Sequence, residues 1–154
     1  SIFTGKTTNW KEVGGPDEDI VLVTRPGSSG TRATFQKYAL DGNEEASNAS
    51  METDDSGVLL TNVKDTKGAI GYVALSYLTG DAGVETVAID GVEPTLENTY
   101  SGEYPVWTFE HMYTKGEPNE VVSAFLDYIT GDKYGSQMEK LVYGVSSKMT
   151  KTEH

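Results

Sequence analysis

The chain has 154 residues, of which 36% are hydrophobic and 23% charged, and its 12 Lys and Arg against 24 Asp and Glu give a formal net charge of −12. This composition is typical of a globular protein, and the length suffices for one ordinary domain. The acidic balance argues against nucleic acid as a partner, because phosphate backbones are bound mainly through basic patches. A small anion is not excluded, because the groups that line a site govern its affinity more than distant surface charge does.

Several kinds of site and segment are absent from the sequence. It has no cysteine, so it offers no disulfide, thiolate nucleophile or cysteine metal site. No run approaches the ~20 apolar residues of a membrane span, and no signal peptide is visible. Residues 41–56 carry only acidic charges, and residues 68–114 contain no Lys or Arg. Both stretches are typical of a solvated acidic surface.

The first predicted elements are short. Residues 2–6 indicate the end of a helix that stops at Gly5 and whose beginning is missing, so we expect a fragment of a longer protein. Asn9 is placed to cap a helical turn over residues 10–13. The apolar run at residues 20–24 then predicts a buried strand.

A glycine- and serine-rich loop follows this strand. Residues 25–32 read Arg-Pro-Gly-Ser-Ser-Gly-Thr-Arg. The helix predicted after them ends near residue 41, since Phe35, Tyr38 and Ala39 recur at helical spacing. A strand, a tight turn and a helix in this order direct backbone N–H groups, and the positive end of the helix dipole, towards one point.

The rest of the chain alternates predicted helices and strands. In order, these are a loop with a helical piece at 43–54, a helix from an N-cap at 54–56 to 65–68, a strand at 68–73, a short helix at 74–78, a strand at 84–89, a short helix at 95–100, a long strand at 104–113, a helix from Asn119 to Gly131, a helix from Asp132 to Val142, and an extended tail at 144–154. This alternation predicts an α/β fold with a mainly parallel sheet flanked by helices.

Most catalytic and phosphate motifs can be rejected. The loop lacks the lysine of a P-loop and the spacing of a dinucleotide-binding fingerprint. It is also one residue short of a nucleophile elbow. The histidines are His111 and the terminal His154, and neither is linked to the loop. Metal-ligand spacing is absent, so the sequence offers little support for an enzyme.

Two interpretations of the loop remain open on spacing alone. In the first it is an oxyanion site, where Arg25 gives two parallel charge-assisted bonds. Ser29 and Thr31 then donate hydroxyls, and the N–H groups of Gly30, Thr31 and Arg32 complete an anion nest. In the second it is an ordinary capped helix, with Ser29 as N-cap and both arginines solvated. The spacing favours neither.

A resemblance changes this balance. Residues 25–35 resemble the phosphate-loop motif of the phosphate-binding proteins that serve ABC importers. Further segments appear in similar order in Gram-positive members of that family: residues 2–6, Asn9-Trp10, and residues 68–73, 90–92 and 110–113. The resemblance covers residues 2–149.

The resemblance implies a set of ligand-binding residues. The phosphate-binding positions are Arg25, Ser29, Gly30 and Thr31, and their neighbours Ser28 and Arg32 are further candidates. Some relatives carry an acidic residue, which orients the arginine, where this chain has Gly27. No cofactor and no metal ion are implied.

The family also implies a domain organisation. Its members have a type II periplasmic-binding-protein-like fold, in which two α/β lobes clamp the ligand between them. Residues 1–103 match the second lobe, with the anion loop, and residues 104–154 match the strand and two helices that return to the first lobe. The N-terminal half of the first lobe is missing, and with it the carboxylate that accepts a proton from hydrogen phosphate. That acceptor disfavours sulfate, which has no proton to give and would leave it unpaired.

The implied function is that of the substrate-binding component of a phosphate ABC importer. It is not an enzyme, and it delivers inorganic phosphate to a membrane permease. We expect an extracellular, cell-surface lipoprotein of a Gram-positive bacterium, with its signal and anchor outside this chain. The alternatives are a binder of sulfate or molybdate, a phosphate-ester hydrolase, and an interaction domain that has lost ligand binding.

The first of the two C-terminal helices carries an apolar stripe of Val122, Phe125, Leu126 and Ile129. If this helix belongs to an absent lobe, the stripe has lost its natural partner. Left in water it would form a large exposed apolar patch. We therefore expect it to pack back on this lobe or on a second copy of the chain, by self-association through the C-terminal helices.

Overall fold

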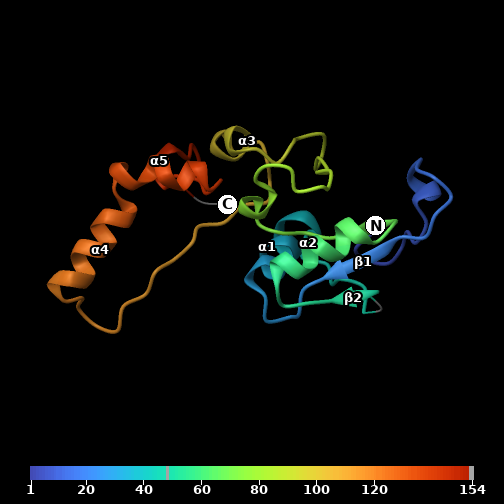
Figure 1. Ribbon diagram of the computed structural model, residues 1–154, viewed down its shortest axis with the longest axis horizontal. Coiled ribbons are helices and arrows are strands. Elements are labelled where there is room, and N and C mark those ends of the chain that lie inside the picture. Colours follow the sequence, from blue (N-terminus) through green and yellow to red (C-terminus); the bar gives the residue numbers. More distant parts are fainter. Residues whose placement is uncertain (48, 153–154) are drawn as a thin grey trace.

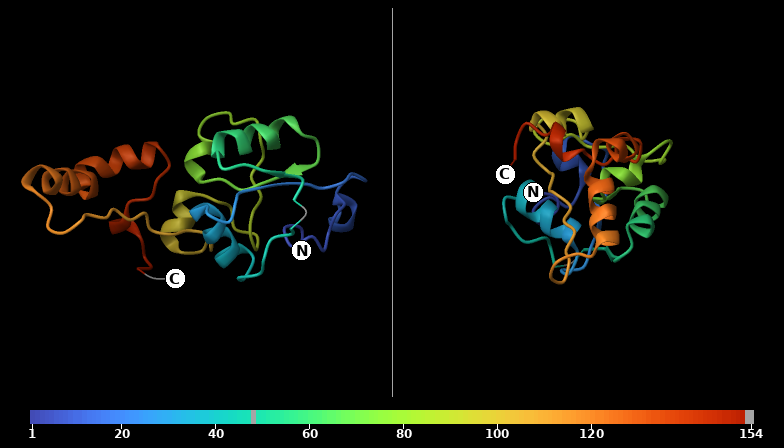
Figure 2. Two further views of the ribbon diagram at one scale, coloured as in Figure 1. Left: turned by 90° about the horizontal axis from the view of Figure 1, so that it is seen from below. Right: turned by 90° about the vertical axis from the view of Figure 1, so that its left-hand side faces the viewer.

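The computed structural model describes residues 1–47 and 49–152. Its centre is a parallel three-stranded sheet in the order β2-β1-β3, formed by β1 (Val21–Thr24), β2 (Met51–Glu52) and β3 (Ala69–Ile70). Two helices make the crossovers, α1 (Gly30–Ala39) from β1 to β2 and α2 (Ser56–Asp65) from β2 to β3. They lie on opposite sides of β1 (Figure 2). The predicted α/β class with parallel strands is confirmed.

Local sequence explains these elements. Strand β1 is β-branched and apolar, and Leu22, Val23 and Thr24 are all buried, as expected for the central strand of a sheet covered on both faces. Helix α2 begins after Asp55, whose carboxylate accepts from the Val58 N–H at 2.8 Å. Such a cap satisfies one of the N–H groups that a helix leaves without an intrahelical acceptor.

Aromatic rings fill the space between α1 and the sheet. Phe35 of α1 stacks on Tyr72 at 4.3 Å between ring centroids, and Phe3 meets Phe35 edge-on at 4.7 Å. On α2, Leu59 is 1% exposed. The Leu59 side chain packs against Gly71, which follows β3. A Cβ built on Gly71 would lie 2.7 Å from Leu59 Cδ2 and 2.9 Å from the Val23 carbonyl oxygen. Gly71 therefore lets the strand end approach α2 closely.

We expect Gly71→Ala to destabilise the chain by about 1–3 kcal/mol, because the added methyl group overpacks the contact with Leu59 and the β1 backbone. Gly27→Ala is the matched control, since a Cβ there meets no atom within 4 Å. Both substitutions restrict the unfolded chain equally. Urea unfolding of the two variants measures the difference, and equal midpoints would contradict the prediction.

The C-terminal part stands apart from the sheet. A 3-10 turn, η2 (Leu75–Leu78), and α3 (Leu96–Ser101) precede a long connection at residues 102–119. Beyond it, α4 (Glu120–Thr130) and α5 (Asp132–Lys140) lie at the far end of the molecule from β2, and η3 (Ser146–Lys148) follows them (Figure 1). No helix within the described residues is long and apolar enough to cross a membrane.

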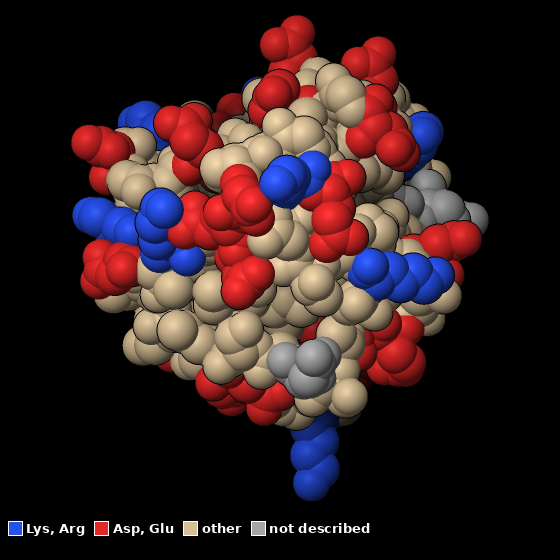
Figure 3. All heavy atoms as spheres, turned by 90° about the vertical axis from the view of Figure 1, so that its right-hand side faces the viewer, with Lys and Arg blue, Asp and Glu red and all other residues tan. Residues whose placement is uncertain are grey.

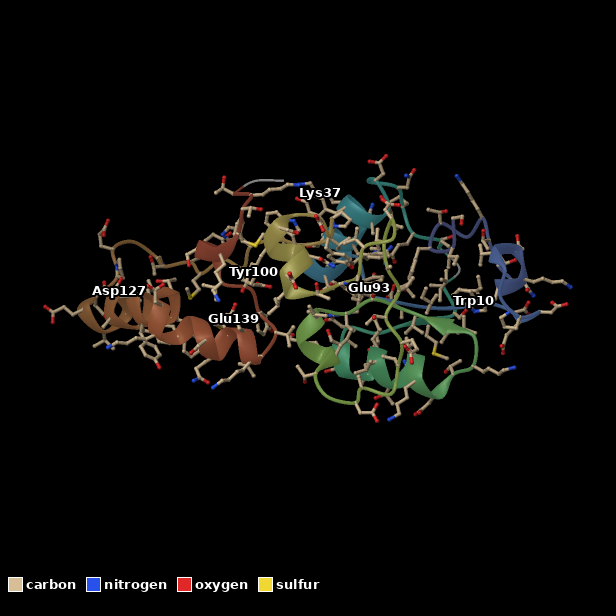
Figure 4. All side chains as sticks on the ribbon, turned by 90° about the horizontal axis from the view of Figure 1, so that it is seen from above. Trp10, Lys37, Glu93, Tyr100, Asp127 and Glu139 are labelled. Atoms are coloured by element: carbon tan, nitrogen blue, oxygen red, sulfur yellow. The ribbon has the colours of Figure 1, made fainter. Side chains whose placement is uncertain are left out.

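Contacts with α3 attach the C-terminal helices to the rest of the chain. The Tyr100 hydroxyl donates to Glu139 Oε1 of α5 at 2.8 Å and accepts from the Val145 N–H at 2.9 Å. Figure 4 shows Tyr100 and Glu139 side by side where α3 meets α5. The carboxylate of Glu139 also pairs with Lys148 at 2.7 Å. This polar junction joins the two parts.

Several predicted elements differ in the structure. Residues 84–89 and 104–113 were expected to be strands, but neither range contains a strand, and Ile89 makes only an isolated bridge to Val92. Conversely, β2 lies inside the acidic range expected to be loop or helix. A strand needs a neighbouring edge to pair with: β1 offers one to β2, and no described strand lies beside residues 104–113. The tail, predicted extended, includes the turn η3.

The expected packing of the apolar stripe on this lobe is wrong. Of this stripe, Phe125 is 56% exposed and Val122 is 37% exposed, whereas Leu126 and Ile129 are half-buried. The main neighbour of α4 is α5, and Figure 1 shows both helices clear of the sheet. The polar junction at α3 holds them there. Packing on a second copy stays a prediction.

Candidate functional site

The loop of residues 25–29 leaves the carboxyl end of β1 and leads into α1. Ligands of open α/β sheets bind at these strand ends. Arg25 and Ser29 are buried, with 8% and 7% of their surface exposed, whereas Gly27 and Ser28 are exposed. Five of the six predicted site residues line one open cleft, namely Arg25, Ser28, Ser29, Gly30 and Thr31, and Arg32 does not. The structure therefore brings these five together, and the same broad opening also borders residues of the connection at 104–113.

Arg25 is held by the connection between β2 and α2. Its NH1 group donates to Ser56 Oγ at 2.7 Å, and its NH2 group donates to the Asp54 carbonyl oxygen at 2.7 Å and lies 3.4 Å from Asp54 Oδ1. The third nitrogen, Nε, is buried and has no acceptor among the described residues. Asp54 and Ser56 thus supply the orientation that Gly27 cannot. Sequence reasoning considered both only as helix caps.

Ser29 is the N-cap of α1, as the capped-helix interpretation predicts. Its Oγ accepts from the Arg32 N–H at 3.3 Å. The hydroxyl proton is still available to a ligand, because a hydroxyl donates once and accepts twice. A Cβ built on Gly30 would meet no atom within 4 Å, so the backbone is open to close approach from outside. The cap and the anion site are compatible.

Arg32 is neither solvated nor directed at the loop's open side. Its NH1 group donates to the Arg25 carbonyl oxygen at 2.6 Å, and its Nε lies 3.5 Å from Glu45 Oε2. Glu52 of β2 approaches NH1 at 3.8 Å. The interpretation of Arg32 as a solvated side chain is therefore wrong. This arginine supports the main chain of the loop.

Glu45 was missed by the sequence reasoning. It lies in the range predicted to be solvated acidic surface, yet its side chain is only 1% exposed. Burial raises the pKa of Glu45, while the Tyr72 hydroxyl and Arg32 oppose that rise. Burial and Glu45 likewise raise the pKa of the Tyr72 phenol. The other acidic side chains of residues 41–56 and 68–114 are exposed, as expected. Acidic side chains are also spread over the face shown in Figure 3.

The described residues offer little support for catalysis by histidine or for metal binding. His111 is exposed, and its ring lies 6.2 Å from that of Tyr113. Within residues 1–47 and 49–152, no group of three or more His, Asp and Glu is arranged to hold a metal ion. The donors at the loop are instead those that bind anions: a guanidinium, hydroxyls and the first N–H groups of a helix.

Comparison with known proteins agrees with this donor set. Residues 1–133 match the model of the PBP superfamily domain. The phosphate-binding protein PstS of Bacillus subtilis is 53% identical over 131 residues, which are 85% of this chain and 43% of that protein. PstS of Borreliella burgdorferi is 27% identical over 138 residues, 84% of this chain and 50% of that protein.

A solved structure is also similar to this chain. It is a phosphate ABC transporter substrate-binding protein of Clostridium perfringens with bound phosphate, which matches with a TM-score of 0.81 and 37% identity over 91% of this chain and 57% of that one. The chain thus spans about half the length of the curated relatives it matches. On the match over residues 1–133, the chain belongs to the PBP superfamily.

Proposed function

We propose that this chain is the anion-loop part of a phosphate-binding protein that serves an ABC importer. One observation carries the proposal. The Arg25 guanidinium is buried and fixed at two nitrogens, while its Nε has no acceptor among the described residues. A buried donor without an acceptor is costly, and an anion at the N-terminus of α1 would supply the acceptor.

The proposed ligand contacts are those of Arg25, Ser29, Gly30 and Thr31. A tetrahedral anion would accept from the free guanidinium N–H groups, from the Ser29 and Thr31 hydroxyls, and from the first N–H groups of α1. Ser28 lies exposed beside them. Arg32 acts through the Arg25 carbonyl oxygen and not through the ligand.

We also propose that residues 1–103 form one lobe and residues 104–154 belong to another. The parallel sheet and both crossover helices lie in the first range. In the second, α4 exposes Phe125 and Tyr128, a face that a further part of the protein would cover. The two lobes would close on phosphate by a hinge motion, and the permease would receive it. The acceptor that discriminates against sulfate would lie on the other lobe.

The whole protein would act outside the cell as a surface lipoprotein, and it would capture phosphate without chemical change. The relatives named above are binding proteins, which supports a transport role and no enzymatic one. Sulfate or molybdate remains the competing ligand, because the donors at the loop do not distinguish these oxyanions.

Titration calorimetry on the full-length parent tests the function. We expect tight phosphate binding that sulfate and molybdate do not displace. The 154-residue chain alone should bind phosphate far more weakly, because about half of the donors and the lobe closure are absent. Micromolar binding by this chain alone would contradict the half-site proposal. Displacement of phosphate by sulfate would contradict the ligand assignment.

A further inference from the structure

The main chain of Arg25 is fixed by side chains on both sides of the residue. Its N–H donates to the Tyr72 hydroxyl at 3.3 Å, and its carbonyl oxygen accepts from Arg32 NH1 at 2.6 Å. The next residue, Pro26, has no N–H to donate. The sheet ladder ends at the residue before, where the Thr24 carbonyl oxygen accepts from the Thr53 N–H. The position of the Arg25 main chain therefore depends on Tyr72 and Arg32, whereas Asp54 and Ser56 hold its guanidinium.

Both of these side chains meet the same buried carboxylate. Glu45 Oε2 lies 3.5 Å from Arg32 Nε, and the Tyr72 hydroxyl is a near neighbour that lowers the pKa of Glu45 against the effect of burial. Both carboxylate oxygens are buried, and neither makes a hydrogen bond among the described residues. The Glu45 side chain is 1% exposed and that of Arg32 is 18% exposed. A buried carboxylate with a single close cation costs more than a well-packed apolar group would, so stability alone does not account for it.

We propose that Glu45 is a positioning residue of the anion site. Its buried carboxylate pairs with Arg32 and lies beside Tyr72, the two side chains that fix the peptide groups of Arg25. This inference rests on the proposed function, because it assigns Glu45 a role in the affinity of the same loop. The exposed Glu52, 3.8 Å from Arg32 NH1, cannot replace it, because solvent screens an exposed pair.

The test compares phosphate affinity of variants in the full-length protein by titration calorimetry. We expect Glu45→Gln to weaken phosphate binding about tenfold, because Arg32 loses the buried negative charge that holds it in place. Glu44→Gln is the matched control, since it removes the same charge from the exposed neighbouring residue. It should leave the affinity within about twofold, as expected for a screened surface charge.

A double-mutant cycle tests whether Glu45 acts through Arg32. Arg32→Gln should weaken phosphate binding about as much as Glu45→Gln, and the double variant should lose little more than either, because coupled residues are not additive. Additive losses would overturn the proposal. If Glu45→Gln does not fold, Arg32→Gln decides alone, and an affinity equal to that of the unmodified protein would overturn it.

The pH dependence separates positioning from a purely structural role. Glu45 faces Arg32 of α1, Tyr72 after β3 and Glu52 of β2, besides its neighbour Glu44. Burial raises the pKa of Glu45, so its carboxylate takes up a proton as the pH falls through that raised value and then resembles Gln. The ratio of the two dissociation constants, Glu45→Gln over unmodified, should therefore fall towards one in acid. Titration of phosphate itself cancels in this ratio.

The outcomes distinguish the two proposals. If the unmodified full-length protein does not bind phosphate, the proposed function fails. If it binds and Glu45→Gln binds equally well at neutral pH, the positioning role of Glu45 fails and the function stands. A ratio that does not change with pH would also overturn the role of the carboxylate charge.

Discussion

Replacing Arg25 by Ala in the full-length protein is expected to weaken phosphate binding by roughly 100-fold or more, because hydrogen bonds to a charged group contribute about 1.5–3 kcal/mol each. The guanidinium is buried and already oriented by Asp54 and Ser56, so little entropy is lost when it binds a ligand. Arg25→Lys keeps the charge but loses the planar fork, and it should recover only part of the affinity.

Lys37→Ala is the control for this experiment. It removes one positive charge from the exposed surface of α1 (Figure 4), and calorimetry should find the affinity for phosphate nearly unchanged. If the two variants bind equally, general electrostatic attraction would account for anion binding, and the assignment of Arg25 would be wrong. Unchanged binding by Arg25→Ala alone would favour a domain that keeps the fold without using this loop.

The largest effect on stability is expected for Leu59→Ala, at about 2–5 kcal/mol. Leu59 is 1% exposed, and its side chain lies against Gly71 and the β1 backbone, where rigid strands limit collapse around a cavity. Urea unfolding of the chain, followed by circular dichroism, measures the change.

Val58→Ala is the neighbouring control on α2, since Val58 is 48% exposed. It should change the free energy of unfolding by less than about 1 kcal/mol. Similar losses for the two variants would mean that α2 does not pack as described. The anion site would be affected only indirectly, because Ser56 at the start of α2 holds Arg25.

Local signals predicted much of the fold near the loop. Apolar periodicity and capping chemistry within a few residues predict the strand at residues 20–24, the caps Ser29 and Asp55, and helices α1, α2, α4 and α5. The predicted strands at 84–89 and 104–113 were wrong because β-branched and aromatic composition does not supply a pairing partner. Strand β2 was missed because it is short and pairs only through its contact with β1.

The candidate site likewise has one part that the sequence predicts and another that only the structure reveals. A single contiguous motif carries the proposed ligand contacts from Arg25 to Thr31, so they could be named without coordinates. Asp54, Ser56 and Glu45 come from other segments, and no spacing rule links them to the loop. The acidic composition around Glu45 even predicted the opposite environment, because charge runs are usually solvated.

The sequence by itself determined the class of the fold and the family resemblance, and it indicated the candidate anion-binding loop, because each is encoded within short contiguous segments. Only the tertiary structure decided how that loop is held. Arg25 is oriented by Asp54 and Ser56, and its peptide groups are fixed by Arg32 and Tyr72 around Glu45. The physical reason is that burial and pairing depend on which distant segments the folded sheet brings together, and these set both the cost of a buried charge and the direction of its hydrogen bonds.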